Sequence, residues 1–312
     1  KNMINRRALL IKLSLAFFGY NFFNRVYSKK INFLNRKKII QKTLVKNNAK
    51  IPSIGMGTWL TFDVGYNTQK ILQRTKVLNA FFQNGGQLID SSPMYGTSET
   101  VLGKCLKNIK NNYKLFSATK VWTPNTWHGI KQIENSIKLW NIKNIDLLQV
   151  HNLVNYEKHL ETLFNLKRNG KIKYVGITTS HGWRHEKTLL IMRNYDLDFV
   201  QFTYNIADRE AEKNLLNLAY EKNISVIVNR PLKGGNLFNI VKNKTLPPWA
   251  ENLGIKPWPS FFLKYVISHK AVTCAIPATT KVKHMKENME AMYGYYPDNK
   301  TRIKMENFIK NI

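Results

Sequence analysis

The sequence predicts an α/β fold in which eight parallel strands close into a (β/α)8 TIM barrel. The chain has 312 residues and 43% hydrophobic residues, enough for one barrel of about 250 residues with extensions. Short apolar runs alternate with segments of helical spacing along most of this length. No G-x-G-x-x-G motif opens a strand–helix unit, which argues against an open dinucleotide-binding sheet. We expect an N-terminal β-hairpin that forms the barrel floor and one additional C-terminal helix.

The first elements follow from local patterns. Lys38–Pro52 predicts two short strands joined by a turn at Asn47-Asn48. The first barrel strand is expected at Ile54–Thr58, where Gly55 and Gly57 would let a cofactor or substrate approach the backbone. The remaining strands are expected at 88–90, 114–120, 145–151, 172–177, 199–202, 225–228 and 272–276.

Helices are expected between these strands wherever apolar residues recur at helical spacing. The chain after Asp90 predicts a helix capped by Thr97 or Ser98, with Glu99 in its first turn. Gly170 is a suitable residue for the end of a helix. The other predicted helices span 69–83, 128–140, 156–169, 184–194, 209–222, 261–268, 281–292 and 298–309.

Four polar residues stand at the ends of three successive strands or just after them. Asp90 ends the second strand, and Tyr95 follows in a loop that contains Pro93 and Gly96. Lys120 and His151 end the next two strands. For Asp90 and Tyr95 alone, a solvated turn is the alternative interpretation. A parallel barrel, however, gathers its catalytic residues at the carboxyl ends of its strands, so we expect the four to meet.

The Asp90, Tyr95, Lys120 and His151 set resembles the catalytic tetrad of the aldo-keto reductases. The resemblance extends from about residue 38 to 293. It includes G-M-G-T-W at Gly55–Trp59, K-I-K-Y-V-G-I-T at Lys171–Thr178, V-Q-F-T-Y-N at Val200–Asn205 and E-N-M at Glu287–Met289. It implies a nicotinamide-dependent oxidoreductase that reduces an aldehyde or ketone to an alcohol.

The chemistry of carbonyl reduction explains these residue types. Tyr95 would donate a proton to the carbonyl oxygen, although a free phenol has a pKa of about 10. We expect the Lys120 ammonium to lower this pKa and Asp90 to hold Lys120 in place. His151 would hydrogen-bond the carbonyl oxygen and orient the substrate. The alternative is a polar barrel mouth without turnover.

The cofactor contacts come from the resemblance. It places the nicotinamide carboxamide at Thr178, Thr179 and Gln201, although many relatives have Ser-Asn at the first two positions. Arg230 and Pro231 replace an aromatic residue that stacks on the ring, and Arg230 can stack or hold phosphate. The 2′-phosphate would bind at Thr279, Thr280 and Lys281. The full expected set is Gly57, Thr58, Thr178, Thr179, Gln201, Arg230, Pro231, Lys233, Gly234, Thr279, Thr280, Lys281, Glu287 and Asn288.

NADPH is the expected cofactor, and NADH stays open. Ala278 and His284 stand where relatives often have basic residues. Lys233 and Gly234 belong to a loop with anion-binding character, whereas Glu287 and Asn288 match a pair that contacts adenine.

Aromatic residues are expected to line the active face and to suit an apolar or aromatic carbonyl substrate. The candidates are Trp59, Trp122, Trp127 and Trp183, and packing in the shell is the alternative for each. The loop Ser180–His185 adds His181 and His185, but no third metal ligand stands at a suitable spacing. We therefore expect no metal site there, and instead a phosphate or substrate contact through His181.

The net charge of +30 does not make this a nucleic-acid-binding protein. The lysines are scattered, and the sequence contains no RNA-binding aromatic platform or recognition-helix motif. The excess of Lys, Asn and Ile is typical of A/T-rich coding. Cys105 and Cys274 lie in no metal or redox spacing, and we expect both to be buried.

Residues 1–36 predict a signal or anchor segment, and residues 37–312 the barrel. Residues 1–50 contain 13 Lys or Arg and no acidic residue, and Arg6-Arg7 precedes a short apolar run. This pattern resembles a twin-arginine export signal, which implies a periplasmic enzyme or one at the periplasmic face of the inner membrane. The segment would then associate the protein with the membrane. A basic amphipathic N-terminal helix and a cytoplasmic location are the alternatives.

A second class of function stays open at this stage. Regulatory subunits of channels resemble the same family and bind nucleotide with little turnover. The complete Asp90, Tyr95, Lys120 and His151 set and the N-terminal segment favour an enzyme. The substrate and the oligomeric state do not follow from one sequence, because substrate-selecting loops vary on a constant barrel.

Overall fold

A computed structural model of the chain describes residues 39–44, 46–109 and 113–312. Its main sheet contains eight parallel strands, each paired with the next along the chain. A parallel bridge between Ile54 and Ala275 connects the first strand to the last, so the sheet closes into a barrel. The strands are β3 (Met56–Gly57), β4 (Leu88–Asp90), β5 (Phe116–Val121), β6 (Ile145–His151), β7 (Ile172–Thr178), β8 (Phe199–Thr203), β9 (Ser225–Asn229) and β10 (Val272–Ala275).

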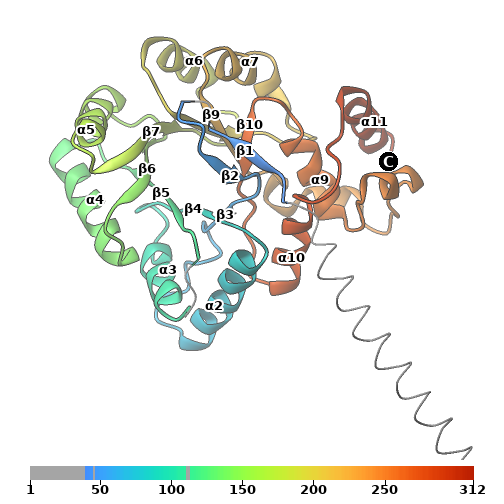
Figure 1. The fold of residues 1–312 in the computed structure, drawn as a ribbon, viewed down its shortest axis with the longest axis horizontal. Helices are drawn as coiled ribbons and strands as arrows, with labels where there is room; N and C mark the ends of the chain where they lie inside the picture. Colours follow the sequence, from blue (N-terminus) through green and yellow to red (C-terminus); the bar gives the residue numbers. More distant parts are fainter. Residues whose placement is uncertain (1–38, 45, 110–112) are drawn as a thin grey trace, which may run out of the picture. The chain divides into compact units, whose positions relative to one another are not determined.

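Helices surround this ring of strands, as the predicted alternation requires (Figure 1). They are α2 (Thr68–Gln83), α3 (Ser98–Lys107), α4 (Thr126–Trp140), α5 (Tyr156–Arg168), α6 (His185–Asn194), α7 (Leu215–Glu221), α8 (Leu237–Ile240), α9 (Trp258–Ile267), α10 (Val282–Glu290) and the C-terminal α11 (Asn299–Lys310). Three 3-10 helices are η1 (Glu210–Glu212), η2 (Lys233–Gly235) and η3 (Pro248–Leu253). No helix within the described ranges is long and apolar enough to cross a membrane.

An antiparallel hairpin forms the barrel floor, which confirms that prediction. It consists of β1 (Gln41–Thr43) and β2 (Lys50–Pro52). Leu44 and Ile51 from this segment are buried against the apolar cluster inside the barrel. That cluster takes one residue from nearly every strand: Leu88, Ala118, Leu147, Tyr174, Phe199, Ile227 and Cys274. The hairpin therefore keeps water from one end of the barrel and leaves the other end for chemistry.

The strand register brings the ends of β4 to β8 to one level. Asp90 pairs with Ala118, and Lys120 pairs with Gln149. His151 pairs with Thr178, which pairs in turn with Gln201. Because the strands are parallel, all these residues lie at the same end of the barrel.

Gly55 and Gly57, at the start of the barrel, lie close to the backbone of neighbouring strands. A Cβ at Gly55 would lie 2.8 Å from the Leu88 carbonyl oxygen, and one at Gly57 would lie 3.0 Å from that of Ile276. Close packing against the neighbouring backbone favours glycine at both positions, and the approach of a cofactor or substrate there stays a prediction.

The predicted helix over 209–222 is wrong as one element. It is divided into η1 and α7 around Lys213 and Asn214. The Glu212 carboxylate accepts hydrogen bonds from buried Tyr204, Tyr265 and Arg302, which belong to the β8–η1 loop, α9 and α11. These contacts fix η1 in place, and α7 begins separately after it.

The cap predicted for α3 is also different. Thr97 is the N-cap residue, but its side chain makes no capping hydrogen bond. Instead its hydroxyl and its backbone N–H both donate to Asp63 Oδ1, at 2.7 and 2.9 Å. Asp63, in the loop after β3, therefore holds the start of α3.

Candidate active site

Asp90 and Lys120 form an ion pair inside the barrel end. Lys120 Nζ lies 2.6 Å from Asp90 Oδ2 and 2.6 Å from the Ser91 carbonyl oxygen, and the Lys120 side chain is fully buried. Burial alone would lower the pKa of Lys120, but Asp90 and Tyr95 together raise it above its ordinary value. The site thus contains a permanent cation held by a carboxylate.

Tyr95 lies beside this cation. Lys120 Nζ is 4.9 Å from the centroid of the Tyr95 ring, so the ammonium lies close to the phenol. Burial raises the pKa of Tyr95 above 10.0, Lys120 lowers it, and Asp90 raises it again. Lys120 thus lowers the pKa of Tyr95, as expected, but the net pKa is raised. The reason is that burial of the phenol, reinforced by Asp90, outweighs the effect of the ammonium.

His151 completes the group at the end of β6. Its ring meets that of Tyr95 edge-on, with 5.7 Å between centroids. Burial and the nearby Lys120 cation lower the pKa of His151 to about 2, so the imidazole is neutral at physiological pH. A phenol with its proton and a neutral imidazole therefore converge next to a buried cation. This arrangement can bind and protonate a carbonyl oxygen.

Sequence analysis missed a second layer of side chains that hold Asp90. Gln149 Nε2 and Gln201 Nε2 donate to Asp90 Oδ1 at 3.1 and 3.0 Å. Gln149 lies on β6, two residues before His151, and is fully buried. A glutamine inside an otherwise apolar strand is the sequence signal that identifies such a residue. Gln201 was predicted as a carboxamide contact, and its amide is already bonded to Asp90.

The predicted nicotinamide region lies at the ends of β7, β8 and β9. Thr178 Oγ1 donates to Gln201 Oε1 at 3.1 Å. Asn229, also absent from the predictions, donates from Nδ2 to the Thr179 carbonyl oxygen at 2.8 Å. The Thr179 hydroxyl is buried without a hydrogen-bond partner among the described residues. A buried polar atom of this kind fits an amide group of a bound cofactor, so the residues present fit nicotinamide.

Gly57 and Thr58 are buried on the other side of the barrel end. The Thr58 hydroxyl lies 2.8 Å from Ser91 Oγ and 3.0 Å from the Asp90 carbonyl oxygen. Its polar group is therefore used to hold the Asp90–Ser91 backbone. The structure places both residues next to the tetrad.

The loop after β9 has a backbone suited to anions. Arg230, Lys233, Gly234 and Gly235 all have positive φ angles, between 49° and 96°. The Arg230 guanidinium packs over Gly234, where a Cβ would lie 3.4 Å from its Nη2. Pro231 between them is buried. Two basic residues and a glycine-rich turn thus lie together, as predicted.

The predicted adenosine contacts lie around the start of α10. Lys281 is the N-cap residue and is exposed, and its backbone N–H donates to Thr279 Oγ1 at 3.2 Å. Thr280 is exposed beside it. One turn and more along the helix, Glu287 lies 3.8 Å from Lys283, and Asn288 is buried. No hydrogen bond or ion pair joins the Lys281 side chain to another described residue, so the ammonium is available to a phosphate.

Three of the predicted substrate residues form one aromatic row. Trp59 meets His181 edge-on at 6.4 Å between centroids, and His181 meets Trp183 at 5.6 Å. Trp59 and Trp183 are 43% and 71% exposed, so these rings are available to a ligand. Trp122 is separate from this row. The Gln132 side chain holds its backbone through two hydrogen bonds of 2.9 Å.

Among the described residues no three His, Cys, Asp or Glu side chains are grouped to hold a metal ion.

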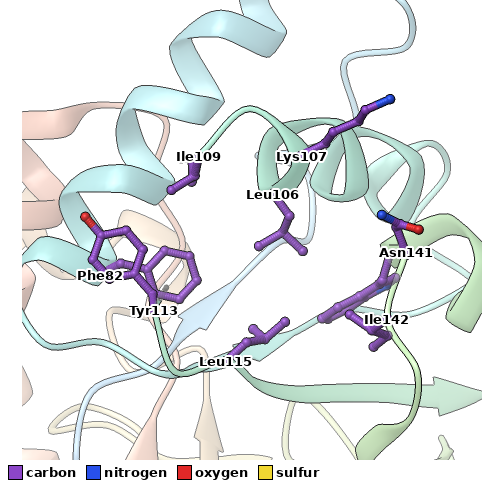
Figure 2. Close-up of a pocket in the computed structure, with 9 residues that line it drawn as sticks. Phe82, Leu106, Lys107, Ile109, Tyr113, Leu115, Asn141 and Ile142 are labelled. Atoms are coloured by element: carbon purple, nitrogen blue, oxygen red, sulfur yellow. The ribbon is translucent and has the colours of Figure 1, made fainter. Parts of the chain in front are cut away.

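A cavity of about 210 Å³ lies at the opposite end of the strands, near the residues that precede β5 and β6 (Figure 2). Its lining is mostly apolar: Phe82, Leu106, Lys107, Ile109, Tyr113, Leu115, Trp140, Asn141 and Ile142.

Comparisons with known proteins agree with this geometry. Methylglyoxal reductase YeaE of Escherichia coli (strain K12) is 25% identical over 259 residues, which cover 81% of this chain and 88% of the relative. A putative voltage-gated potassium channel subunit beta of Schizosaccharomyces pombe is 27% identical over 225 residues, 64% of each chain. An aldo/keto reductase structure from Klebsiella pneumoniae in complex with NADP and acetate superposes with a TM-score of 0.71 at 21% identity, over 86% of this chain and 96% of that one.

The family model carries the assignment, because it covers the barrel from the first strand to the C-terminal helix. The model of the Aldo/keto reductase family matches residues 53–301. This range contains Asp90, Tyr95, Lys120 and His151 and all the predicted cofactor positions. The chain therefore belongs to the aldo/keto reductase family, whose members are NAD(P)H-dependent carbonyl reductases.

Proposed function

We propose that this protein reduces an aldehyde or ketone with NADPH and that Tyr95 donates the proton. The observation that carries the proposal is the group at the ends of β4, β5 and β6, where Lys120 pairs with Asp90 and lies beside the Tyr95 ring, next to a neutral His151. When bound, the nicotinamide supplies a hydride to the carbonyl carbon. The protein must then deliver a proton to the oxygen.

Each side chain has a distinct part in this proposal. Tyr95 keeps its proton at neutral pH, because burial raises its pKa. Lys120 stabilises the phenolate that remains after transfer, and Asp90 keeps Lys120 charged and oriented. His151, being neutral, donates a hydrogen bond to the carbonyl oxygen without competing as a proton source.

The preference for NADPH rests on cations near the start of α10 and in the loop after β9. Lys281 is exposed at the N-terminus of α10, where backbone N–H groups and the helix dipole favour an anion. Arg230 and Lys233 add positive charge in the neighbouring loop. The Klebsiella pneumoniae structure with NADP has the same fold.

A panel of carbonyl compounds, assayed with NADPH and with NADH, tests the substrate class and the cofactor preference. Methylglyoxal belongs in it because of the Escherichia coli relative. Aromatic aldehydes belong in it because Trp59, His181 and Trp183 form an exposed aromatic row. We expect NADPH-dependent turnover of at least one class.

The decisive variant is Tyr95→Phe. It removes the proton donor and keeps the ring, so we expect kcat to fall by about 10² to 10⁴-fold while the Kd for NADPH changes less than a few-fold. Tyr66→Phe, at a tyrosine that is 80% exposed, is the matched control and should keep full activity. Near-normal turnover of Tyr95→Phe would remove Tyr95 from the mechanism.

A nucleotide-binding subunit with little turnover is the second candidate. The similarity to the potassium channel subunit beta of Schizosaccharomyces pombe supports it. NADPH binding without turnover of any panel compound would favour this second function.

A further inference from the structure

Ser92 links the two groups that would contact the carbonyl oxygen. It lies in the loop after β4, is fully buried, and precedes Tyr95 by three residues. Its carbonyl oxygen accepts the Tyr95 N–H at 3.0 Å, and its Oγ accepts the Met94 N–H at 3.2 Å. The same Oγ lies 3.0 Å from His151 Nδ1.

The contacts of Ser92 determine the direction of its hydrogen bond with His151. A hydroxyl has one proton to donate, and a buried one is normally donated. The Met94 N–H is itself a donor, so it occupies a lone pair of Oγ and cannot take the proton. Within the described part of the chain, His151 Nδ1 is the one acceptor in reach of Ser92 Oγ. Ser92 therefore donates, and Nδ1 accepts.

We propose that Ser92 is a positioning residue that fixes the tautomer of His151, so that the ring presents an Nε2–H donor to the carbonyl oxygen. In a neutral imidazole one nitrogen donates and the other accepts, and the partner of one nitrogen decides which. This inference rests on the proposed carbonyl reduction for its functional meaning. The tautomer itself is a property of the protein alone.

The rest of the environment agrees with this assignment. Nε2 makes no hydrogen bond to a described residue, so it remains available for a ligand. Burial and the Lys120 cation keep the ring neutral, so the choice of tautomer matters. With the opposite tautomer, the Ser92 hydroxyl hydrogen and an Nδ1 hydrogen would both lie between Oγ and Nδ1. Nε2 would then present a lone pair to the carbonyl oxygen, which also carries lone pairs, so no hydrogen bond could form there.

The direct test is the tautomer of His151 in the full chain labelled with ¹⁵N-histidine. Long-range ¹H–¹⁵N spectra distinguish a protonated ring nitrogen from an unprotonated one, and His151→Gln assigns the signals. We expect Nδ1 to be unprotonated and Nε2 to carry the proton from pH 6 to 9. A proton on Nδ1, or a doubly protonated ring, would overturn the proposal whether or not the protein is active.

The second test compares two serine substitutions. Ser92→Ala should mix the two tautomers and lower kcat by roughly three- to tenfold, the loss expected from one neutral hydrogen bond, with the Kd for NADPH unchanged. Ser260→Ala is the matched control, because Ser260 is equally buried in α9 and its hydroxyl has no partner among the described residues. It should leave both the His151 spectrum and kcat unchanged. An unaltered His151 spectrum in Ser92→Ala would assign the tautomer to another cause.

Discussion

Tyr95 shows how a single residue is set by opposing effects. Burial and Asp90 favour the neutral phenol, and Lys120 favours the phenolate. The sequence places Lys120 near Tyr95, but the net direction depends on how completely the phenol is removed from water. That balance determines the pH range in which the residue acts as an acid.

The raised pKa of Tyr95 predicts the pH profile of reduction. A general acid must carry its proton, and a pKa above 10 moves its loss to higher pH. We expect kcat/KM for reduction to stay level from about pH 7 to about pH 10 and to fall only above that range. After each exposure to high pH the enzyme is assayed again at pH 8, which controls for unfolding. A reversible fall centred well below pH 10 would show that Lys120 dominates after all.

A second residue-scale prediction concerns Lys281. If its ammonium binds the 2′-phosphate, Lys281→Ala should weaken NADPH binding by about ten- to a hundredfold and leave NADH nearly unchanged, because only NADPH carries that phosphate. Lys286→Ala, an exposed lysine of the same helix, is the control for the loss of one positive charge. Equal losses of affinity for both cofactors would show that the phosphate is held elsewhere, with Arg230 and Lys233 as the next candidates.

At the scale of elements, one buried carboxylate joins α3, β5 and α4. Glu99 lies in the first turn of α3, as predicted, yet it does more than complement the helix dipole. Its oxygens accept from Thr119 at 2.7 Å, Ser136 at 2.8 Å and Trp140 Nε1 at 2.9 Å. Thr119 is the neighbour of Lys120 on β5, so this junction supports the strand that carries the catalytic cation.

Removal of this junction should destabilise the barrel. Glu99→Ala leaves three buried donors without an acceptor, and we expect the free energy of unfolding to fall by about 3 kcal/mol. Glu99→Gln keeps the shape and part of the bonding, and should lose about 1 kcal/mol. Urea unfolding measures both. Glu134→Ala, on the exposed face of α4, should stay within about 0.5 kcal/mol of the parent. Equal stability of Glu99→Ala and the parent would contradict this role.

At the scale of the whole molecule, the N-terminal segment and the barrel are expected to have separate tasks. Residues 1–38, which contain Arg6-Arg7, lie outside the described residues. The hairpin that covers the barrel floor begins at Gln41, and Leu44 and Ile51 from it are buried against the apolar cluster inside the barrel. We expect a chain that lacks residues 1–36 to remain active.

The location of the protein is tested through Arg6-Arg7. We propose that this pair directs the barrel to the periplasm or to the periplasmic face of the inner membrane. Replacement of both residues by lysine keeps the charge but removes a receptor-recognised signal, so the protein should accumulate in the cytoplasm of a bacterial host. A purely electrostatic membrane anchor would be unaffected by the change. If the parent and the Lys-Lys variant fractionate alike, Arg6-Arg7 is not an export signal, and the cytoplasm becomes the expected location.

The sequence alone predicted most of the architecture and the position of the candidate site. Strand and helix periodicity is a local property, and it identified all eight strands within a few residues. The ends of parallel strands meet on one face, so Asp90, Lys120 and His151 were expected together before any distance was known. The break in the helix over 209–222 escaped because Glu212 is held by Tyr265 and Arg302, which lie 53 and 90 residues away in the chain.

What only the tertiary structure decided is the state of each group in that site. The raised pKa of Tyr95, the two amides on Asp90 and the hydroxyl of Ser92 on His151 depend on burial and on contacts between strands 59 or 111 residues apart. The residue types at a strand end determine which chemistry is available there. Protonation and hydrogen-bond direction depend on how much solvent folding excludes and on which partners it brings into hydrogen-bonding distance. Local sequence determines neither of them.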